Sequence, residues 1–284
     1  INAPRTATTI ITLNMNQNDY KSEYDKGVWL NQVAGLFVDF HFKNDCTVKN
    51  LKLSGNIKVG LFTDNGELTY VTKRATEEQI GVGGFAARTA NSSGTVFFDN
   101  FHLENITVYG GVMTGGAIGY IDGYSNKKRN VTFKNWTINR GTVSTWVDGS
   151  GSTGGLVGCN NGYGQLIITG NTDTSDKENV NSLTVSAYAE KYESAAAGGI
   201  LGVCDFGSMI VKNVNAKKIA VTSKNVRDVG GMIGAGRQSV QSTQNNLEII
   251  NCTLNTIQVY LNMNYYSRVP DSYTGGVIGY NQKK

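Results

Sequence analysis

The chain has 284 residues, a formal net charge of +4, 35 glycines and only 2 prolines. The small charge excludes the broad basic surface of a nucleic-acid-binding protein, and no run approaches the about 18 apolar residues that a membrane span needs. Apolar residues never recur at helical spacing for more than about one turn, so we expect an all-β protein with glycine and asparagine in its turns.

The first 27 residues differ from the rest of the chain. Thr8–Leu13 is rich in β-branched residues and predicts a strand, and a polar stretch follows at 14–26. We expect residues 1–27 to form an N-terminal strand and cap segment, because the open end of a stack of strands is a template for aggregation.

From residue 28 to residue 284 the sequence repeats itself. Short apolar runs opened by glycine start near residues 34, 83, 115, 154, 198, 230 and 275. Five of these runs have the form GGxxG, and their second glycines are Gly116, Gly155, Gly199, Gly231 and Gly276. Repeats of this length are typical of solenoids, propellers and arrays. We expect each glycine pair to permit a tight corner.

A second motif lies between the glycine runs. It reads Asn or Asp, apolar, polar, apolar, two polar residues, apolar, polar, apolar, which predicts two short strands with a turn between them. Its copies open at Asp45, Asn100, Asn135, Asn213 and Asn251. Because asparagine tolerates left-handed backbone, we expect these residues to form a column at one corner and to hydrogen-bond along it.

Stacked copies would also align their apolar residues. One inward column is expected to contain Leu51, Ile106, Ile219 and Ile257. A second is expected to contain Leu53, Val108, Val143, Val221 and Val259. The copy between Gly155 and Gly198 is irregular and carries an insertion at 170–177.

The GGLVG and GGILG runs, each followed by a segment such as 211–214 and a closing Ile-x-Val, resemble the GLUG motif. That repeat occurs in bacterial surface proteins, including the non-catalytic part of immunoglobulin A–cleaving peptidases. The resemblance covers roughly residues 28–284. It implies an exported, adhesin-like or lipoprotein module, extracellular or on the bacterial cell surface, whose signal segment lies outside this chain. The His-Glu-x-x-His signature of the peptidase is missing from the sequence, so the resemblance does not imply a protease.

These patterns together predict a parallel β-helix-like solenoid of about six imperfect glycine-rich repeats, one coil per repeat and on the order of 30 Å long. A β-propeller and a β-sandwich remain as alternatives, because blades of about 40–50 residues would fit the period. The scarcity of Asn-Gly and Asp-Gly hairpin signals between clean strands favours the solenoid.

Two classes of function fit such a fold. The first is a non-catalytic module for adhesion, binding or spacing, with a glycan or protein of a host or cell surface as partner. The second is a polysaccharide lyase or hydrolase built on a β-helix. The sequence identifies no catalytic residue, no cofactor and no metal site, since it has 2 histidines and 4 widely spaced cysteines without a Cys-x-x-Cys pair.

The candidate binding residues lie after the glycine runs and in the variable connections. In-register stacking would bring Asp205 beside Arg237, with Asp122 two coils away from Asp205. Exposed aromatic residues would stack on sugar rings or on protein partners. These aromatic residues are Tyr124, Trp146, Tyr163, Tyr265 and Tyr266.

All four cysteines are expected to be free. Cys46 and Cys252 would share a column about five coils apart, roughly 24 Å, which is far beyond the about 7 Å limit for a disulfide. Cys159 directly follows the last glycine of its run, whereas Cys204 comes two residues after the last glycine of its run. This one-residue offset would point the two side chains to opposite sides of a strand.

Overall fold

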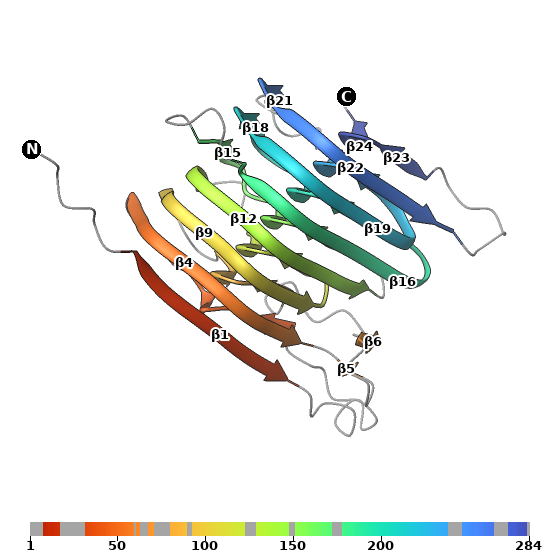
Figure 1. The fold of residues 1–284 in the computed structure, drawn as a ribbon, viewed down its shortest axis with the longest axis horizontal. Coiled ribbons are helices and arrows are strands. Elements are labelled where there is room, and N and C mark those ends of the chain that lie inside the picture. Colours follow the sequence, from red (N-terminus) through yellow and green to blue (C-terminus); the bar gives the residue numbers. More distant parts are fainter. Residues whose placement is uncertain are drawn as a thin grey trace, which may run out of the picture.

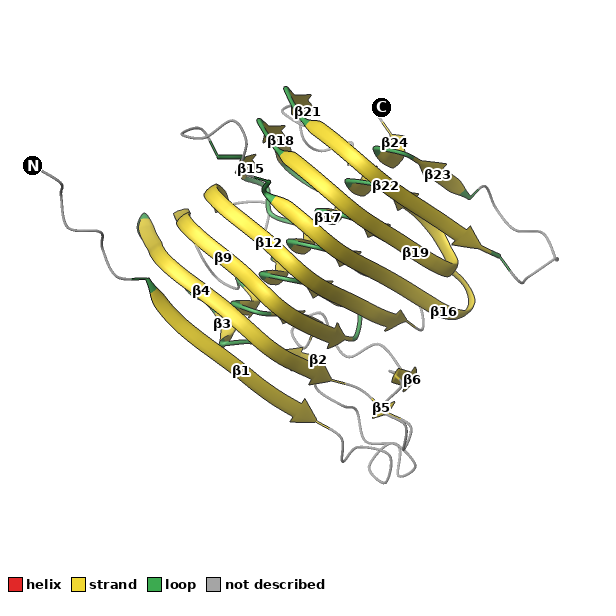
Figure 2. Ribbon diagram, viewed as in Figure 1, coloured by secondary structure: helices red, strands yellow, loops and turns green. Residues whose placement is uncertain are grey.

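The computed structural model describes residues 8–17, 32–59, 61–62, 68–70, 80–89, 93–122, 129–147, 151–171, 178–237, 246–263 and 272–282. This part of the chain is built from strands and turns without a helix (Figure 2). Two large parallel sheets contain nearly all the strands, and a short antiparallel pair, β5 (Leu61–Phe62) and β6 (Leu68–Tyr70), stands apart. The all-β prediction is therefore confirmed, and the long parallel sheets are compatible with a parallel β-helix.

The larger sheet has 15 strands. Its long strands lie side by side in chain order (Figure 1): β1 (Thr9–Gln17), β4 (Cys46–Val59), β9 (Gly94–Gly110), β12 (Arg129–Val147), β16 (Val180–Gly198), β19 (Asn215–Gly230) and β22 (Thr253–Asn262). Its short strands are β2 (Gln32–Ala34), β7 (Ile80–Gly83), β10 (Met113–Gly115), β13 (Ser152–Gly154), β15 (Gln165–Thr169), β18 (Ser208–Lys212), β21 (Leu247–Ile250) and β23 (Tyr273–Gly275).

The second sheet has seven short strands, and each follows one of the glycine runs. They are β3 (Phe37–Asp39), β8 (Ala86–Arg88), β11 (Ile118–Ile121), β14 (Val157–Asn160), β17 (Leu201–Cys204), β20 (Ile233–Arg237) and β24 (Ile278–Gln282). We call one passage of the chain through both sheets a rung. Equivalent residues of successive rungs lie side by side, as in the column Ile118, Val157, Leu201, Ile233 and Ile278.

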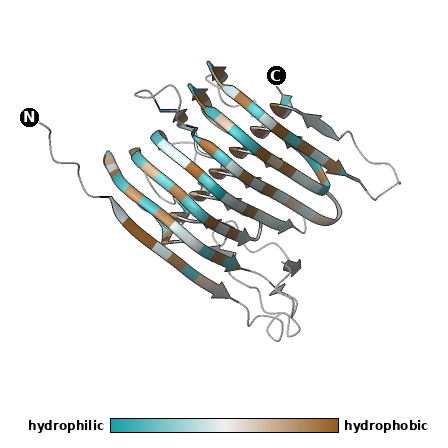
Figure 3. Ribbon diagram, in the orientation of Figure 1, coloured by the Kyte–Doolittle hydropathy of each residue, from teal (hydrophilic) through white to brown (hydrophobic). Residues whose placement is uncertain are grey.

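Left-handed residues recur every five positions along the long strands. The pairs are Asn50 and Gly55, Asn100 and Asn105, Asn135 and Arg140, Asn213 and Lys218, and Asn251 and Thr256, all with positive φ. Each such residue turns the strand at a corner. Four residues lie between corners, and the first and third of them point inward; in β9 these are Phe101, Leu103, Ile106 and Val108, all at most 1% exposed. Figure 3 shows the resulting alternation of apolar and polar residues.

This five-residue period corrects the expected alignment of the first copy. Asn50, and not Asp45, lies beside Asn100, and Asp45 instead accepts a hydrogen bond from the backbone N of Thr95 at 2.8 Å. The prediction was wrong because the strand before the corner has the same alternation as the strand after it. The first copy was therefore aligned one segment too early.

The two apolar columns change accordingly in the first copy. Leu51 lies beside Phe101, and Leu53 lies beside Leu103. The positions predicted for them are held by Gly55, beside Ile106, and by Ile57, beside Val108. The later members remain aligned as predicted: Ile219 pairs with Ile257, and Val221 pairs with Val259.

The asparagines of the column share a left-handed backbone conformation, but their side-chain amides do not form a continuous hydrogen-bonded ladder. Asn100 Nδ2 donates to Asn50 Oδ1 at 2.8 Å, whereas Asn135 Nδ2 donates to Asp99 Oδ1 at 3.0 Å. In the irregular rung the position is taken by Gly170, whose backbone N bonds to Lys212 O at 2.8 Å. Asn213 lies in the next rung with an exposed side chain, so it is not the buried corner that an amide ladder would require.

The glycine pairs are required by close contact between rungs. A Cβ on Gly116, Gly155, Gly199 or Gly231 would lie within 3.0 Å of the carbonyl oxygen of the equivalent glycine in the next rung. Gly276 is the exception, since a Cβ there would meet nothing within 4 Å. None of these five glycines has a positive φ, so the space between rungs, and not backbone conformation, demands glycine.

All four cysteines are free. Cys159 pairs with Val203, whereas Cys204 pairs with Asn160, so the one-residue offset places the two thiols in different apolar clusters, as expected. Cys46 and Cys252 do not share a column, because Cys46 lies beside Val96, in the segment before the Asn50 corner, while Cys252 follows the corner at Asn251.

Candidate functional site

The second sheet packs against the short strands β10, β13 and β23 and against the C-terminal ends of β16 and β19. We call the row of side chains between the two sheets the seam. From the larger sheet the seam contains Met113, Ser152, Ala196, Asp228 and Tyr273, which are aligned in register. From the second sheet it contains Tyr120, Cys159, Val203, Ala235 and Tyr280. Small residues fill its middle, and charged and aromatic residues gather toward β23 and β24.

A buried carboxylate is the centre of the charged part of the seam. Asp228 is 0% exposed and accepts hydrogen bonds from two arginines. Arg227 donates from Nε to Oδ1 at 3.0 Å and from Nη2 to Oδ2 at 2.9 Å, and Arg237 donates from Nη2 to Oδ2 at 2.9 Å. Two guanidinium groups compensate the large cost of removing a carboxylate from water.

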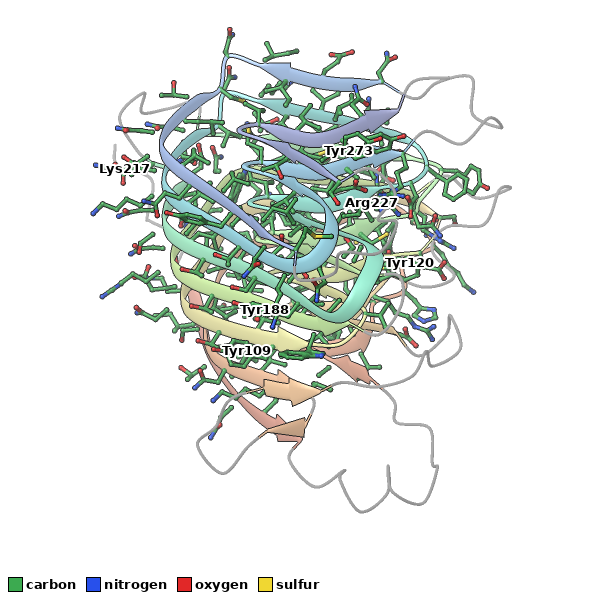
Figure 4. All side chains as sticks on the ribbon, turned by 90° about the vertical axis from the view of Figure 1, so that its right-hand side faces the viewer. Tyr109, Tyr120, Tyr188, Lys217, Arg227 and Tyr273 are labelled. Carbon is green, nitrogen blue, oxygen red and sulfur yellow. The ribbon has the colours of Figure 1, made fainter. Side chains whose placement is uncertain are left out.

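Aromatic rings cover this ion cluster. The guanidinium of Arg227 lies over the ring of Tyr280, 5.5 Å from its centroid, which is within the range of a cation–π interaction. Tyr280 in turn packs on Tyr273 with 4.6 Å between ring centroids. Figure 4 shows Arg227, Tyr273 and Tyr120 on one side of the molecule, away from Tyr109 and Tyr188. We call Asp205, Arg227, Asp228, Arg237, Tyr273 and Tyr280 the Asp228 cluster.

Asp205 joins this cluster from the end of β17. Its backbone N donates to Asn160 O at 3.0 Å, which places it at the edge of the second sheet. Burial raises the pKa of the Asp205 carboxyl, the positive charges of Arg237 and Arg227 oppose that rise, and the negative charge of Asp228 adds to it. A carboxyl with a raised pKa beside arginines is a feature found both in structural ion networks and in functional sites.

The expected neighbours Asp205 and Arg237 do come together. Cys204 pairs with Asn160 on one side and with Gly236 on the other. Asp205 follows Cys204 and Arg237 follows Gly236, so the two residues lie in neighbouring rungs at the same edge of the second sheet. Asp122 belongs to the same edge, because Ile121 pairs with Asn160.

Sequence reasoning missed Arg227 and Asp228. A signal was present, however: Asp228 stands two residues before a glycine pair, where the other rungs place Met113, Ser152, Ala196 and Tyr273. It is the only charged residue at that position. A charge in a column of otherwise uncharged residues predicts a special local environment, and the charged residue next to it supplies part of its compensation.

The predicted aromatic residues fall into separate places. Trp146 lies on the long sheet beside Tyr188, with 5.9 Å between ring centroids. Tyr163 stacks on Phe206, which directly follows Asp205 in the sequence, with 4.9 Å between ring centroids. Tyr124, Tyr265 and Tyr266 lie outside the described residues. Tyr163 therefore contacts the residue that follows Asp205, whereas Trp146 lies on the long sheet.

Within the part of the chain that the structure describes, no three His, Cys, Asp or Glu side chains converge as metal ligands would. The same part has no helix that is long and apolar enough to cross a membrane. No protein-family model, no curated protein and no solved structure matches the chain.

Proposed function

We propose that this chain is a parallel β-solenoid of about six glycine-rich repeats, and that it serves as a non-catalytic binding or spacing module, extracellular or on a bacterial cell surface. The observation that carries the proposal is the in-register parallel pairing of both sheets from β1 to β24. Stacking of this kind produces an extended surface with a fixed spacing of about 4.8 Å between rungs, which suits a spacer or a repetitive binding surface.

The outward face of the long strands supports a binding or spacing role. One of its columns consists of Asn56, Thr107, Thr142, Thr184, Ala220 and Gln258. These side chains are short, uncharged and mostly able to donate and accept hydrogen bonds. A flat hydroxyl and amide surface can contact a glycan or a protein without holding a reacting group in place.

The Asp228 cluster also argues for a structural role of its charges. Glycosidases need two carboxyl groups that flank the scissile bond and are about 5–9.5 Å apart. Asp228 is fully enclosed and hydrogen-bonded to two arginines, so a substrate has no access to its carboxylate. Asp205 alone does not make such a pair.

The resemblance to GLUG repeats adds a location to this proposal. An exported module of a bacterial surface protein or lipoprotein would present its long sheet to a host or cell-surface glycan or protein. Free, buried thiols do not argue against export, because the rung geometry holds Cys159 and Cys204 in different clusters and so disfavours a disulfide between them.

A polysaccharide lyase or hydrolase is the second candidate, and one observation favours it. Asp205 has a raised pKa and lies near Arg237 at the edge of the second sheet, and the next residue, Phe206, stacks on Tyr163; a general acid beside rings that stack on a sugar would use such an arrangement. The enzyme reading needs Asp205 to be the reacting group.

One experiment separates the two functions. The chain is applied to a glycan array and to immobilised host matrix proteins, and in parallel to a panel of polysaccharides with detection of reducing ends and unsaturated products. We expect binding without product formation, and we expect Asp205→Asn to leave binding unchanged. Product formation that Asp205→Asn abolishes would replace the module by the enzyme.

A further inference from the structure

The two outermost long strands differ from every long strand between them. β1 (Thr9–Gln17) and β22 (Thr253–Asn262) contain no Asp, Glu, Lys, Arg or Pro. β4, β9, β12, β16 and β19 each contain two or more charged residues. Soluble proteins usually blunt an exposed strand edge with charge or proline, because a bare edge pairs with other chains. Here the protected strands carry the charges and the edge strands carry none.

Both outermost strands have a free side among the described strands. β1 pairs with β4 alone, and β22 pairs with β19 alone. Large exposed apolar side chains gather at the same two ends. Apart from Phe97, those among the residues that the structure describes are Ile10, Phe37 and Val38 at the β1 end and Ile250, Tyr260 and Val277 at the β22 end. Ile10 is 65% exposed and Tyr260 is 56% exposed, which is unusual for residues of their size.

The inward side chains of β22 are incompletely covered. Leu254, Ile257 and Val259 are only partly buried, whereas their neighbours in β19, Ala216, Ile219 and Val221, are at most 1% exposed. One more strand on β22 would bury them as β22 buries the residues of β19. The end of the stack therefore has apolar area that association would remove from water.

β1 has the side chains that such a strand would need. Following the register from strand to strand, Ile11 belongs to the column of Leu254, Leu13 to the column of Ile257, and Met15 to the column of Val259. A strand with the sequence of β1, placed on β22, would continue all three apolar columns with one extra residue of β22 between Leu254 and Ile257, as β9 has against β4 between Leu103 and Ile106.

We propose that β22 of one copy binds β1 of a second copy, head to tail and in parallel, so that the sheet continues from one molecule into the next. A contact between two β22 strands would be antiparallel and would put the corners and columns out of register. The head-to-tail contact joins two different surfaces and does not close on itself, so it yields linear oligomers. This inference does not depend on the proposed function.

Sedimentation of the 284-residue chain over a range of concentrations tests the proposal, with two variants that each block one end. Val259→Lys and Met15→Lys change partly buried side chains at opposite ends of the stack. In a monomer the new amine reaches water past the end of the stack, whereas in the oligomer it would be enclosed among apolar side chains. We expect dimers and longer oligomers for the wild type and at least about tenfold weaker association for each variant, since an unpaired charge is strongly disfavoured among apolar side chains.

Thr184→Lys is the matched control. It adds the same charge to an exposed, outward position of β16 in the middle of the stack, and it should associate like the wild type. A mixture of Val259→Lys and Met15→Lys should form dimers but no longer species, because each variant keeps one competent end. Circular dichroism checks folding, and Leu261→Lys, another partly buried residue of β22, replaces Val259→Lys if that variant does not fold.

Three results would overturn the proposal. The first is a wild-type chain that stays monomeric at all concentrations, which would leave the β22 end to a different partner or to none. The second is dimerisation of Met15→Lys alone with a monomeric Val259→Lys, which would indicate contact between two β22 ends. The third is wild-type association by both variants, which would place the contact on another surface.

Discussion

Replacing the second glycine of a GGxxG run by alanine should show whether glycine is needed there because the next rung lies too close for a Cβ. In Gly199→Ala the new Cβ would lie 2.8 Å from Ile219 Cγ2 and inside 3.0 Å of Gly231 O. Ordinary contacts of a Cβ lie at 3.4–4 Å, so the rung that contains Gly231 must move away. Gly276→Ala is the matched control, because it has the same position in the repeat and nothing within 4 Å of its added Cβ.

The magnitude follows from what such a movement breaks. Ile200 N and Leu201 N both donate to Met232 O, at 2.8 and 3.0 Å, and both bonds join the rungs that must separate. Two backbone hydrogen bonds contribute about 1 kcal/mol each, and overpacking of a filled interior costs about 1–3 kcal/mol. Alanine also lowers the entropy of the unfolded chain, which offsets about 0.4–1 kcal/mol. We expect Gly199→Ala to lose about 3 kcal/mol of unfolding free energy.

Urea unfolding followed by far-ultraviolet circular dichroism measures the difference, at a protein concentration where the chain is monomeric. Gly276→Ala should gain about 0.4–1 kcal/mol of unfolding free energy over the wild type, because only the lower entropy of its unfolded chain distinguishes the two. Equal midpoints for Gly199→Ala and the wild type would refute the crowding argument. So would an equal loss in both variants, since it would mean that the corner needs glycine for its backbone conformation.

Four further outcomes follow from single residues. Asn213→Val should cost about 1–2 kcal/mol and Asn213→Gly almost nothing, because the exposed corner needs left-handed backbone and not an amide; equal losses in thermal unfolding would contradict this. Burial raises the pKa of Cys204 to about 12, so a thiol reagent at about pH 8 should not label it in the folded protein, and mass spectrometry should find four labelled thiols after denaturation. Asp228→Ala should lose about 3–5 kcal/mol, because two arginines would be left without their carboxylate; a loss under about 1 kcal/mol in urea unfolding would show that water compensates them. The Arg88 guanidinium hydrogen-bonds to Asp39 and lowers the pKa of that carboxyl. The stabilisation of the folded protein by this pair is therefore present above the unfolded-state pKa of 3.8 and is lost as pH falls through the lower folded-state pKa. Arg88→Met should remove this part of the acid dependence of the melting temperature.

Local patterns were sufficient to predict the class of the fold. Alternating apolar residues predicted strands, the glycine pairs marked the start of each second-sheet strand, and asparagine marked left-handed corners. Each of these signals depends on the conformational preference or the size of a single residue, so it can be recognised without knowing its neighbours in space. The same holds for the juxtaposition of Asp205 and Arg237, which required only that copies stack in register.

The register itself was decided by the tertiary structure. Each rung repeats the same five-residue pattern several times, so Asp45 and Asn50 open stretches that look alike, and only pairing with the next strand shows that Asn50 is the partner of Asn100. The burial of Asp228 was equally hidden, because the arginine that completes its compensation, Arg237, arrives from the other sheet. Alternation determines which side of a strand faces inward, whereas the choice among equivalent segments is made by the side chains that fill the space between rungs.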